Sequence, residues 1–308
     1  MKQSRTSRSK RPSTFIFVIA GMACLVSCVL TVVIASLRTS DEVVNHGDST
    51  DIIVNGDFGA PVIVSMPDNF QEPTALESHT LIEGGGGEIV EGGAVLLRTS
   101  SFDSRTGEII SEYGEGTVHL IRADEEGLSD FAPFVIGQKQ GTRLLIARPD
   151  EIDGKPASEI IVMDLLHLSA FGQSKDPSEY ANDIIPSVTL SDQGVPQIQA
   201  QGARIGKMST VTLIEGSGGQ IDTEQKIAIQ YVVTDGHGTV IDSTWEDGSP
   251  VLVNLDELME GLQEGLENQK VGSRVLVVIP SALAKGDGDR IAVVDILAAE
   301  NKPGDEKK

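Results

Sequence analysis

Residues 254–280, NLDELMEGLQEGLENQKVGSRVLVVIP, contain the pattern that decides the fold. Asn254 stands three residues before Glu257, which is the spacing of a capping box at the start of a helix. Apolar residues then recur at the spacing of one helical face, at Leu255, Leu258, Met259, Leu262 and Leu266. The pattern predicts a short amphipathic helix that begins after Asn254 and buries one side.

The same stretch goes on to predict a tight turn and a strand. A turn is expected at 271–272, and residues 274–279 are mostly apolar and β-branched until a proline ends the run. Gly261 and Gly265 lie inside the predicted helix, where each glycine costs about 1 kcal/mol relative to alanine. Glycine at these positions indicates that the helix approaches a neighbouring backbone closely.

Strand patterns surround the helix. Residues 227–233 are rich in strand-forming side chains and lead into the sequence DGHG at 235–238, which predicts a hairpin. Further strands are expected at 239–244, 250–255 and 291–297. Several antiparallel strands with one short helix predict an α+β domain in which the sheet folds over the helix.

Taken together, residues 212–299 resemble an FKBP-type peptidyl-prolyl cis/trans isomerase domain. The pieces that carry the resemblance occur in the family's order: Tyr231, Gly238, Ile241-Asp242-Ser243, Gly261-Leu262, Gly265-Leu266, residues 270–274, Ile279-Pro280, Gly286 and Asp295. The resemblance implies an antiparallel sheet wrapped around one short helix, and isomerisation of X-Pro peptide bonds as the activity.

Prolyl isomerisation requires rotation about an amide bond with a barrier of about 18–20 kcal/mol. An apolar pocket that removes water from the prolyl amide favours the twisted form, in which charge separation is smaller. This chemistry needs no nucleophile, metal or cofactor, and none is expected here.

The resemblance assigns roles residue by residue. Tyr231 and Asp242 fall on the pocket tyrosine and on the acidic residue near it, and are expected to be the catalytic pair. Eight further positions are expected to bind substrate: Ile241, Val251, Val253, Leu258, Met259, Leu262, Lys285 and Val294.

Two departures from the family leave other functions open. Several pocket positions that hold aromatic rings in the family are aliphatic here, and residues 287–290 form a short loop where the family has a long flap. One alternative is therefore a non-catalytic chaperone or binding module of the cell envelope that keeps the FKBP-like fold. A purely structural stalk protein is a third reading.

An internal repeat predicts a second copy of the domain. Residues 80–89, TLIEGGGGEI, match residues 212–221, TLIEGSGGQI, at an offset of 132. Weaker matches extend the repeat, so that residues 56–168 are predicted to be a diverged copy. Thr99 and Ser111 replace the catalytic pair there, and Pro133 is expected to break or end its helix. We expect this copy to be inert in catalysis.

The N-terminal residues predict attachment to a membrane. Residues 1–13 are basic, and residues 14–37 are apolar and long enough to cross a bilayer as a helix. The basic flank would stay in the cytoplasm, so the domains that follow would lie outside the cell membrane. A lipoprotein signal is the alternative, because the sequence LVSC ends at Cys28, which would then carry a lipid anchor.

The predicted organisation is accordingly a cytoplasmic tail (1–13), an anchor or signal (14–37), a stalk (38–55), the diverged domain (56–168), a linker (169–190), the isomerase domain (191–299) and a charged tail (300–308). Six of the 24 Lys and Arg residues lie in 1–38, which has no acid, so all 46 acids lie beyond it. This acidity excludes nucleic acid as a partner. Proline-containing polypeptides that have been exported are the expected partners.

Overall fold

We describe the protein from a computed structural model. It describes the backbone of Glu42–Val43, which form β1, and residues 52–110, 116–152, 154–176, 185–200 and 205–302. The chain divides into two compact units, Met1–Glu42 and Val43–Lys308. The predicted tail and anchor lie outside the described residues. Within the described part of the chain, we find no helix of the length and apolarity that crossing a bilayer requires.

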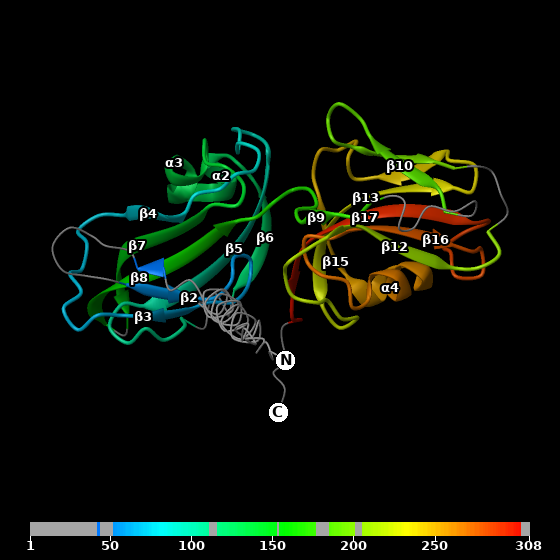
Figure 1. The fold of residues 1–308 in the computed structure, drawn as a ribbon. Helices are drawn as coiled ribbons and strands as arrows, with labels where there is room; N and C mark the ends of the chain where they lie inside the picture. Colours follow the sequence, from blue (N-terminus) through cyan, green and yellow to red (C-terminus); the bar gives the residue numbers. More distant parts are fainter. Residues whose placement is uncertain are drawn as a thin grey trace, which may run out of the picture. The chain divides into compact units, whose positions relative to one another are not determined.

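The first domain is built on a five-stranded antiparallel sheet in the order β4-β7-β8-β5-β6 (Figure 1). Its strands are β4 (Glu77–Ile82), β5 (Ala94–Asp103), β6 (Thr117–Arg122), β7 (Arg143–Ile152) and β8 (Lys155–Leu165). One face packs on the helical turns α2 (Glu125–Leu128), η1 (Ser129–Phe131) and α3 (Ala132–Val135). The other face packs on the hairpin of β2 (Ile53–Asn55) and β3 (Ile63–Ser65).

The second domain is built on a seven-stranded sheet in the order β14-β13-β17-β16-β12-β9, with β15 also paired to β13. Its strands are β9 (Gln173–Ser174), β12 (Ser209–Glu215), β13 (Lys226–Asp235), β14 (Val240–Ser243), β15 (Val251–Asn254), β16 (Arg274–Ile279) and β17 (Arg290–Glu300). The helix α4 (Glu260–Leu266) covers one face, and the hairpin of β10 (Ser187–Leu190) and β11 (Pro196–Gln199) covers the other (Figure 1).

The two sheets have the same central strand order, β5-β8-β7-β4 in the first and β13-β17-β16-β12 in the second. The pairing register repeats as well. Ala94 lies opposite Arg122 at the start of the β5–β6 pair, and Lys226 lies opposite Asn254 at the start of the β13–β15 pair. The sequence repeat therefore corresponds to a repeat of topology and register.

The glycines of the repeated motif allow backbone segments to approach closely. A Cβ added to Gly84 would lie 2.4 Å from the carbonyl oxygen of Gln140, and one added to Gly216 would lie 2.2 Å from that of Val271. Side chains do not fit at such distances, so both domains need glycine where the first strand of the repeat meets the turn before β7 or β16.

Each sheet also buries an ion pair at equivalent positions. Arg143 Nε donates to Asp164 Oδ1 at 2.6 Å, and Nη2 donates to Oδ2 at 2.8 Å. Arg274 makes the same two hydrogen bonds to Asp295, at 2.6 and 2.7 Å. Each carboxylate accepts one further hydrogen bond from a backbone N–H, so both charged groups are satisfied inside the fold.

The predicted single helix after Asn254 is wrong in one respect. The segment forms a short 3₁₀ turn, η3 (Leu255–Glu257), and then α4, because the backbone is extended at Leu258 and Met259. Asn254 does not cap the turn through its side chain; instead Nδ2 donates to Glu257 Oε1 at 2.9 Å. The expected capping box is therefore absent.

Pro133 also behaves differently from the prediction. The helical segment of the first domain breaks earlier, at Ser129, whose φ of 50° lies in the left-handed region. Pro133 occupies the first turn of α3, where a missing N–H leaves no helical hydrogen bond unmade.

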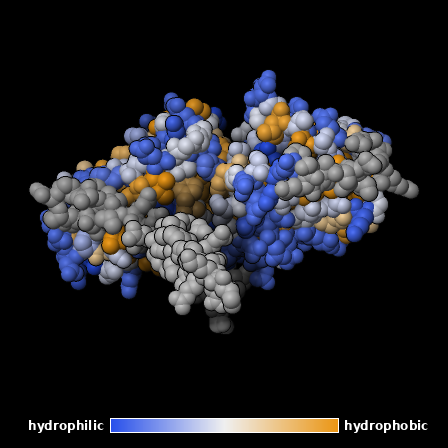
Figure 2. Space-filling model, viewed as in Figure 1, coloured by the Kyte–Doolittle hydropathy of each residue, from blue (hydrophilic) through white to orange (hydrophobic). Residues whose placement is uncertain are grey.

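The described surface in the view of Figure 2 is mostly hydrophilic, in keeping with a formal net charge of −22.

Candidate functional site

The candidate site lies on the face of the seven-stranded sheet that α4 covers. Alternate residues of β13, β16 and β17 point to this face, because successive side chains of a strand point to opposite sides. They pack with Leu255, Leu262 and Leu266 into one buried apolar cluster. The sheet and the helix thus build an apolar wall on which further side chains rest.

Two glycines set the distance between α4 and the sheet. A Cβ on Gly261 would lie 2.4 Å from Ile279 Cγ2, and one on Gly265 would lie 2.7 Å from Val277 Cγ1. The close approach expected from the sequence is present, and the neighbours are side chains of β16 rather than backbone. The backbone N–H of Gly261 donates to the carbonyl of Leu283 at 3.0 Å, which ties the helix start to the loop after β16.

The structure brings seven of the ten predicted site residues together on this face. Val294 and Leu262 are buried within the cluster. Five others are half-buried and pack against it: Tyr231, Val251, Val253, Leu258 and Met259. The extended backbone at Leu258 and Met259 places both side chains at the edge of the cluster, before α4 begins.

Tyr231 and Asp242 are joined directly. The Tyr231 hydroxyl donates to Asp242 Oδ2 at 2.7 Å. The backbone N–H of Tyr231 donates to Thr244 Oγ1 at 2.8 Å, which fixes the tyrosine against the chain that follows β14. Burial of the phenol, followed by the hydrogen bond to Asp242 and nearby negative charge, raises the pKa of Tyr231 to about 12. The hydroxyl therefore keeps its proton at neutral pH.

Ile241 and Lys285 lie apart from the cluster, although both were predicted to bind substrate. The β13–β14 register shifts between Val233 and Thr234, so that Ile241 is the extra residue of a bulge. Its side chain is 51% exposed. Lys285 is exposed in the loop after β16. Asp242 is exposed as well and meets the site through Tyr231.

The chemistry available here is that of an apolar surface with one polar edge. Aliphatic side chains provide the water-poor wall, and the Tyr231 hydroxyl, already bonded to Asp242, provides a polarised group beside it. Among the described residues, no group of three or more His, Cys, Asp or Glu is arranged to hold a metal ion.

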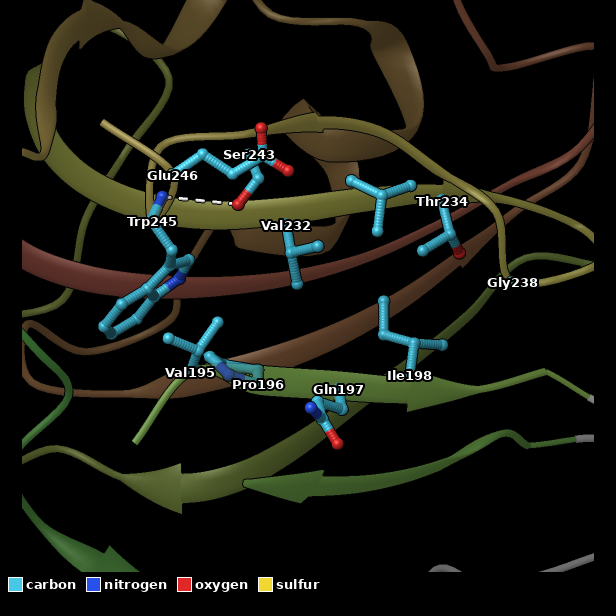
Figure 3. Close-up of a pocket in the computed structure, with 11 residues that line it drawn as sticks. Val195, Pro196, Gln197, Ile198, Val232, Thr234, Gly238, Ser243, Trp245 and Glu246 are labelled. Carbon is cyan, nitrogen blue, oxygen red and sulfur yellow. Dashed lines mark hydrogen bonds between the residues drawn. The ribbon is translucent and has the colours of Figure 1, made fainter. Parts of the chain in front are cut away.

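A second hollow, which the sequence reasoning missed, lies on the other face of the same sheet. It has a volume of about 370 Å³ and lies between the β10–β11 hairpin and strands β13 and β14 (Figure 3). Val232 and Trp245 contribute to its walls. The one signal in the sequence was Trp245 itself, the single tryptophan of the chain, three residues after Asp242.

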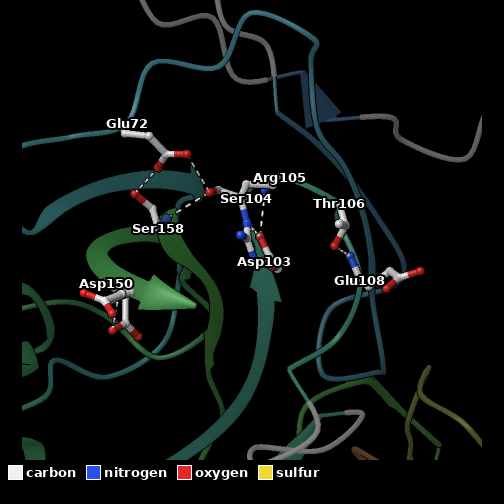
Figure 4. A network of polar contacts seen from close by, with 9 residues as sticks. Glu72, Asp103, Ser104, Arg105, Thr106, Glu108, Asp150 and Ser158 are labelled. Carbon is white, nitrogen blue, oxygen red and sulfur yellow. Dashed lines mark hydrogen bonds and ion pairs between the residues drawn. The ribbon is translucent and has the colours of Figure 1, made fainter. Parts of the chain in front are cut away.

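A polar network in the first domain has a structural role (Figure 4). The carboxylate of Glu72 accepts hydrogen bonds from the hydroxyls of Ser104, at 2.8 Å, and of Ser158. The N–H of Ser158 donates to Ser104 Oγ at 2.9 Å. These bonds fasten the segment before β4 to the ends of β5 and β8.

In this domain Thr99 stands where Tyr231 does and bonds to His119 at 3.1 Å, while Ser111 lies outside the described residues.

Comparison with known proteins gives one family. A family model described as FKBP-type peptidyl-prolyl cis-trans isomerase matches residues 218–295. An FK506-binding protein of Streptomyces anulatus is 33% identical over 90 residues, which cover 27% of this chain and 73% of that protein. The FKBP-type peptidyl-prolyl cis-trans isomerase FkpA of Buchnera aphidicola is 35% identical over 71 residues.

The matches cover different shares of the relatives. The Buchnera match covers 23% of this chain and 30% of the relative, so most of the relative has no counterpart in the alignment. Among solved structures, FkpA from Escherichia coli matches with a TM-score of 0.30 and 20% identity, over 41% of this chain and 56% of the other.

Proposed function

The chain belongs to the FKBP-type peptidyl-prolyl cis-trans isomerase family, and we propose that its second domain, residues 191–299, isomerises X-Pro bonds of polypeptides. The observation that carries the proposal is the hydrogen bond of Tyr231 to Asp242 at the edge of a contiguous apolar cluster. The matched residues, 218–295, include both members of this pair.

The geometry supports catalysis without a covalent step. A prolyl ring placed against Val251, Met259 and Leu262 would lose water, and the planar amide would lose the solvation that stabilises its charge separation. The twisted amide depends less on that solvation, so it binds better than the planar form. Tyr231, held by Asp242, would position the substrate at the edge of the apolar wall.

A second function is favoured by the make-up of the wall. Tyr231 contributes the only aromatic ring among the described residues of this cluster, and the remaining side chains are aliphatic. Such a wall supports loose binding of apolar polypeptide as well as catalysis. The alternative function is therefore a chaperone or binding module with this fold and no turnover.

For the first domain we propose a supporting role without catalysis. Its sheet has the strand order of the second, but Thr99 bonds to His119 where the second domain has the Tyr231–Asp242 pair. Thr99 has no aromatic ring, so it cannot provide the ring and hydroxyl that Tyr231 places beside the apolar cluster of the second domain. We propose that residues 56–168 are a diverged copy that acts as a spacer or as a binding module.

The place of action is part of the proposal and rests on sequence. Residues 14–37 would anchor the chain in the cell membrane, or residues up to Cys28 would form a lipoprotein signal. Either arrangement would present the domains to exported polypeptides.

The test is the rate of cis/trans isomerisation of a short X-Pro peptide with the full chain in detergent. The double variant Tyr231→Ala/Asp242→Ala is compared with Thr99→Ala, the equivalent position in the first domain. We expect acceleration that the double variant loses and Thr99→Ala keeps. No acceleration by folded wild-type protein would refute the isomerase, and binding of the peptide without acceleration would identify the chaperone.

A further inference from the structure

The hollow on the far face of the second sheet lies between the β10–β11 hairpin and strands β13 and β14. Its volume of about 370 Å³ falls in the range of small-ligand pockets. The hairpin provides Val195, Pro196 and Ile198, and the sheet provides Val232 opposite them (Figure 3). Apolar residues of two separate elements therefore line this hollow, and the apolar cluster under α4 is separate from it.

Trp245 contributes its indole ring to the wall of this hollow. The indole Nε1 of Trp245 is buried and donates no hydrogen bond to the described residues. Figure 3 shows the indole nitrogen on the side of the ring that faces Val232 and Pro196. Because this nitrogen is buried behind the wall, a molecule in the hollow would meet the ring of Trp245 and not its N–H.

The cavity opens toward an apolar edge of the sheet. Val240 lines it and is nevertheless 49% exposed, and its neighbour Ile241 is 51% exposed. Both belong to β14, which ends the strand order of the sheet. On the same strand, Asp242 bonds to Tyr231 of the candidate site. The edge strand β14 therefore contributes Asp242 to the candidate site and Val240 to the hollow.

The charge around the opening is negative. Glu246 lines the cavity and is exposed, and Asp247 and Asp242 are exposed on the same segment. A basic group beside an apolar one would meet these carboxylates favourably.

We propose that this cavity binds one apolar side chain of an extended polypeptide, at a residue next to a lysine or arginine. The apolar side chain lies against the ring of Trp245, and the basic side chain faces Glu246. Proline is not required. The inference rests on the proposed function only in taking a polypeptide as the occupant, because the same edge strand leads to the proposed isomerase site.

Trp245 makes a direct test possible. It is the single tryptophan of the 308 residues, so tryptophan emission of the full chain reports on this cavity alone. The probe is the peptide acetyl-Ser-Lys-Leu-Leu-Lys-Ser-amide, which contains no proline, tyrosine or tryptophan. We expect a saturable shift of Trp245 emission on titration with this peptide.

Variants distinguish the cavity from other surfaces. Val240→Asp places a charge on a half-exposed side chain that lines the hollow, and we expect it to abolish the shift. Ile63→Asp is the matched control, because Ile63 is 70% exposed and lies on β3 of the first domain. Glu246→Gln removes the charge beside the hollow; with a fluorescein-labelled peptide read by anisotropy, it should weaken binding about five-fold.

The outcomes separate this inference from the proposed function. A saturable shift in a protein without isomerase activity would support the cavity and refute the isomerase. Isomerase activity without any shift would overturn the cavity proposal. An equal shift in Val240→Asp would overturn it too. If the dye 1-anilinonaphthalene-8-sulfonate changes Trp245 emission and the peptide does not, the cavity holds small apolar molecules, and a polypeptide occupant is wrong.

Discussion

Tyr231 and Asp242 are not opposite each other in the β13–β14 pair, yet their side chains are joined at 2.7 Å. Asp242 lies opposite Val233, two residues further along β13 on the same face as Tyr231. The tyrosine therefore reaches its partner diagonally, which its length allows. This diagonal contact links the apolar face under α4 to the exposed edge strand.

Removing either member of this pair should reduce isomerisation by a similar amount. Tyr231→Phe keeps the ring and removes the hydroxyl, and Asp242→Asn weakens the acceptor. One hydrogen bond contributes about 1 kcal/mol, which corresponds to a loss of roughly five-fold in kcat/KM. Because the two groups act together, the double variant should be no worse than either single one. Losses that multiply in the double variant would show that the two residues act separately.

Stability should fall at high pH because of Tyr231. Its pKa is raised to about 12 in the folded protein, above its value in an unfolded chain, so the folded state holds this proton more tightly. The contribution is fully present below the unfolded pKa of about 10 and is lost as pH rises through the folded pKa.

Tyrosinate absorbance, recorded as wild type minus Tyr231→Phe, measures this pKa directly. Denaturant unfolding at increasing pH should show the wild type losing more free energy of unfolding than Tyr231→Phe. A difference spectrum that titrates near pH 10 would contradict the prediction.

Gly261→Ala should destabilise the second domain despite alanine's better helix propensity. The new methyl would lie 2.4 Å from Ile279 Cγ2 in a buried cluster, and overpacking of this kind costs about 1–3 kcal/mol. The better helix propensity of alanine offsets only about 1 kcal/mol of this cost. Thermal unfolding measures the difference.

The control for Gly261 is Gly219→Ala, since a Cβ at Gly219 would have no neighbour within 4 Å. Ile279→Ala should cost less free energy in the Gly261→Ala background than in wild type, because the clash is relieved. Equal costs in both backgrounds would exclude the contact as the cause.

Asp295→Ala should cost about 3–5 kcal/mol, because it leaves Arg274 charged and buried without its partner. The double variant Arg274→Met/Asp295→Leu should recover part of that loss by removing both charges. Asp287→Ala, at an exposed position, serves as the control and should stay within about 0.5 kcal/mol of wild type. If Asp295→Ala proved as mild as Asp287→Ala, the ion pair would not stabilise the fold.

Local patterns predicted most of the second domain. The strand expected at 274–279 is β16, and the strand expected at 250–255 contains β15, because β-branched runs bounded by turn residues specify strands locally. The helix was predicted less well. The side chain of Gln263 donates to the carbonyls of Asp256 and Leu258, at 2.9 and 2.7 Å. These bonds stabilise the interruption between η3 and α4, which the local sequence pattern does not predict.

In the candidate site, too, some features follow from local patterns and others do not. Tyr231 and Val294 share a face because strand periodicity is regular, and the family resemblance supplied their positions. Ile241 left the expected face because of the bulge in β14, which periodicity does not predict. The hollow at Trp245 was not predicted, because four of its eleven lining residues, 195–198, come from the β10–β11 hairpin and are distant from Trp245 in the sequence.

The repeated ion pair allows the two domains of this chain to be compared with each other position by position. Arg143–Asp164 and Arg274–Asp295 have the same geometry, whereas Thr99 occupies in the first domain the position that Tyr231 has in the second. If one gene segment was duplicated, selection retained the bridge in both descendants and released the hydroxyl pair in one. The two sheets therefore share the buried ion pair as part of their common architecture and differ at the position of Tyr231.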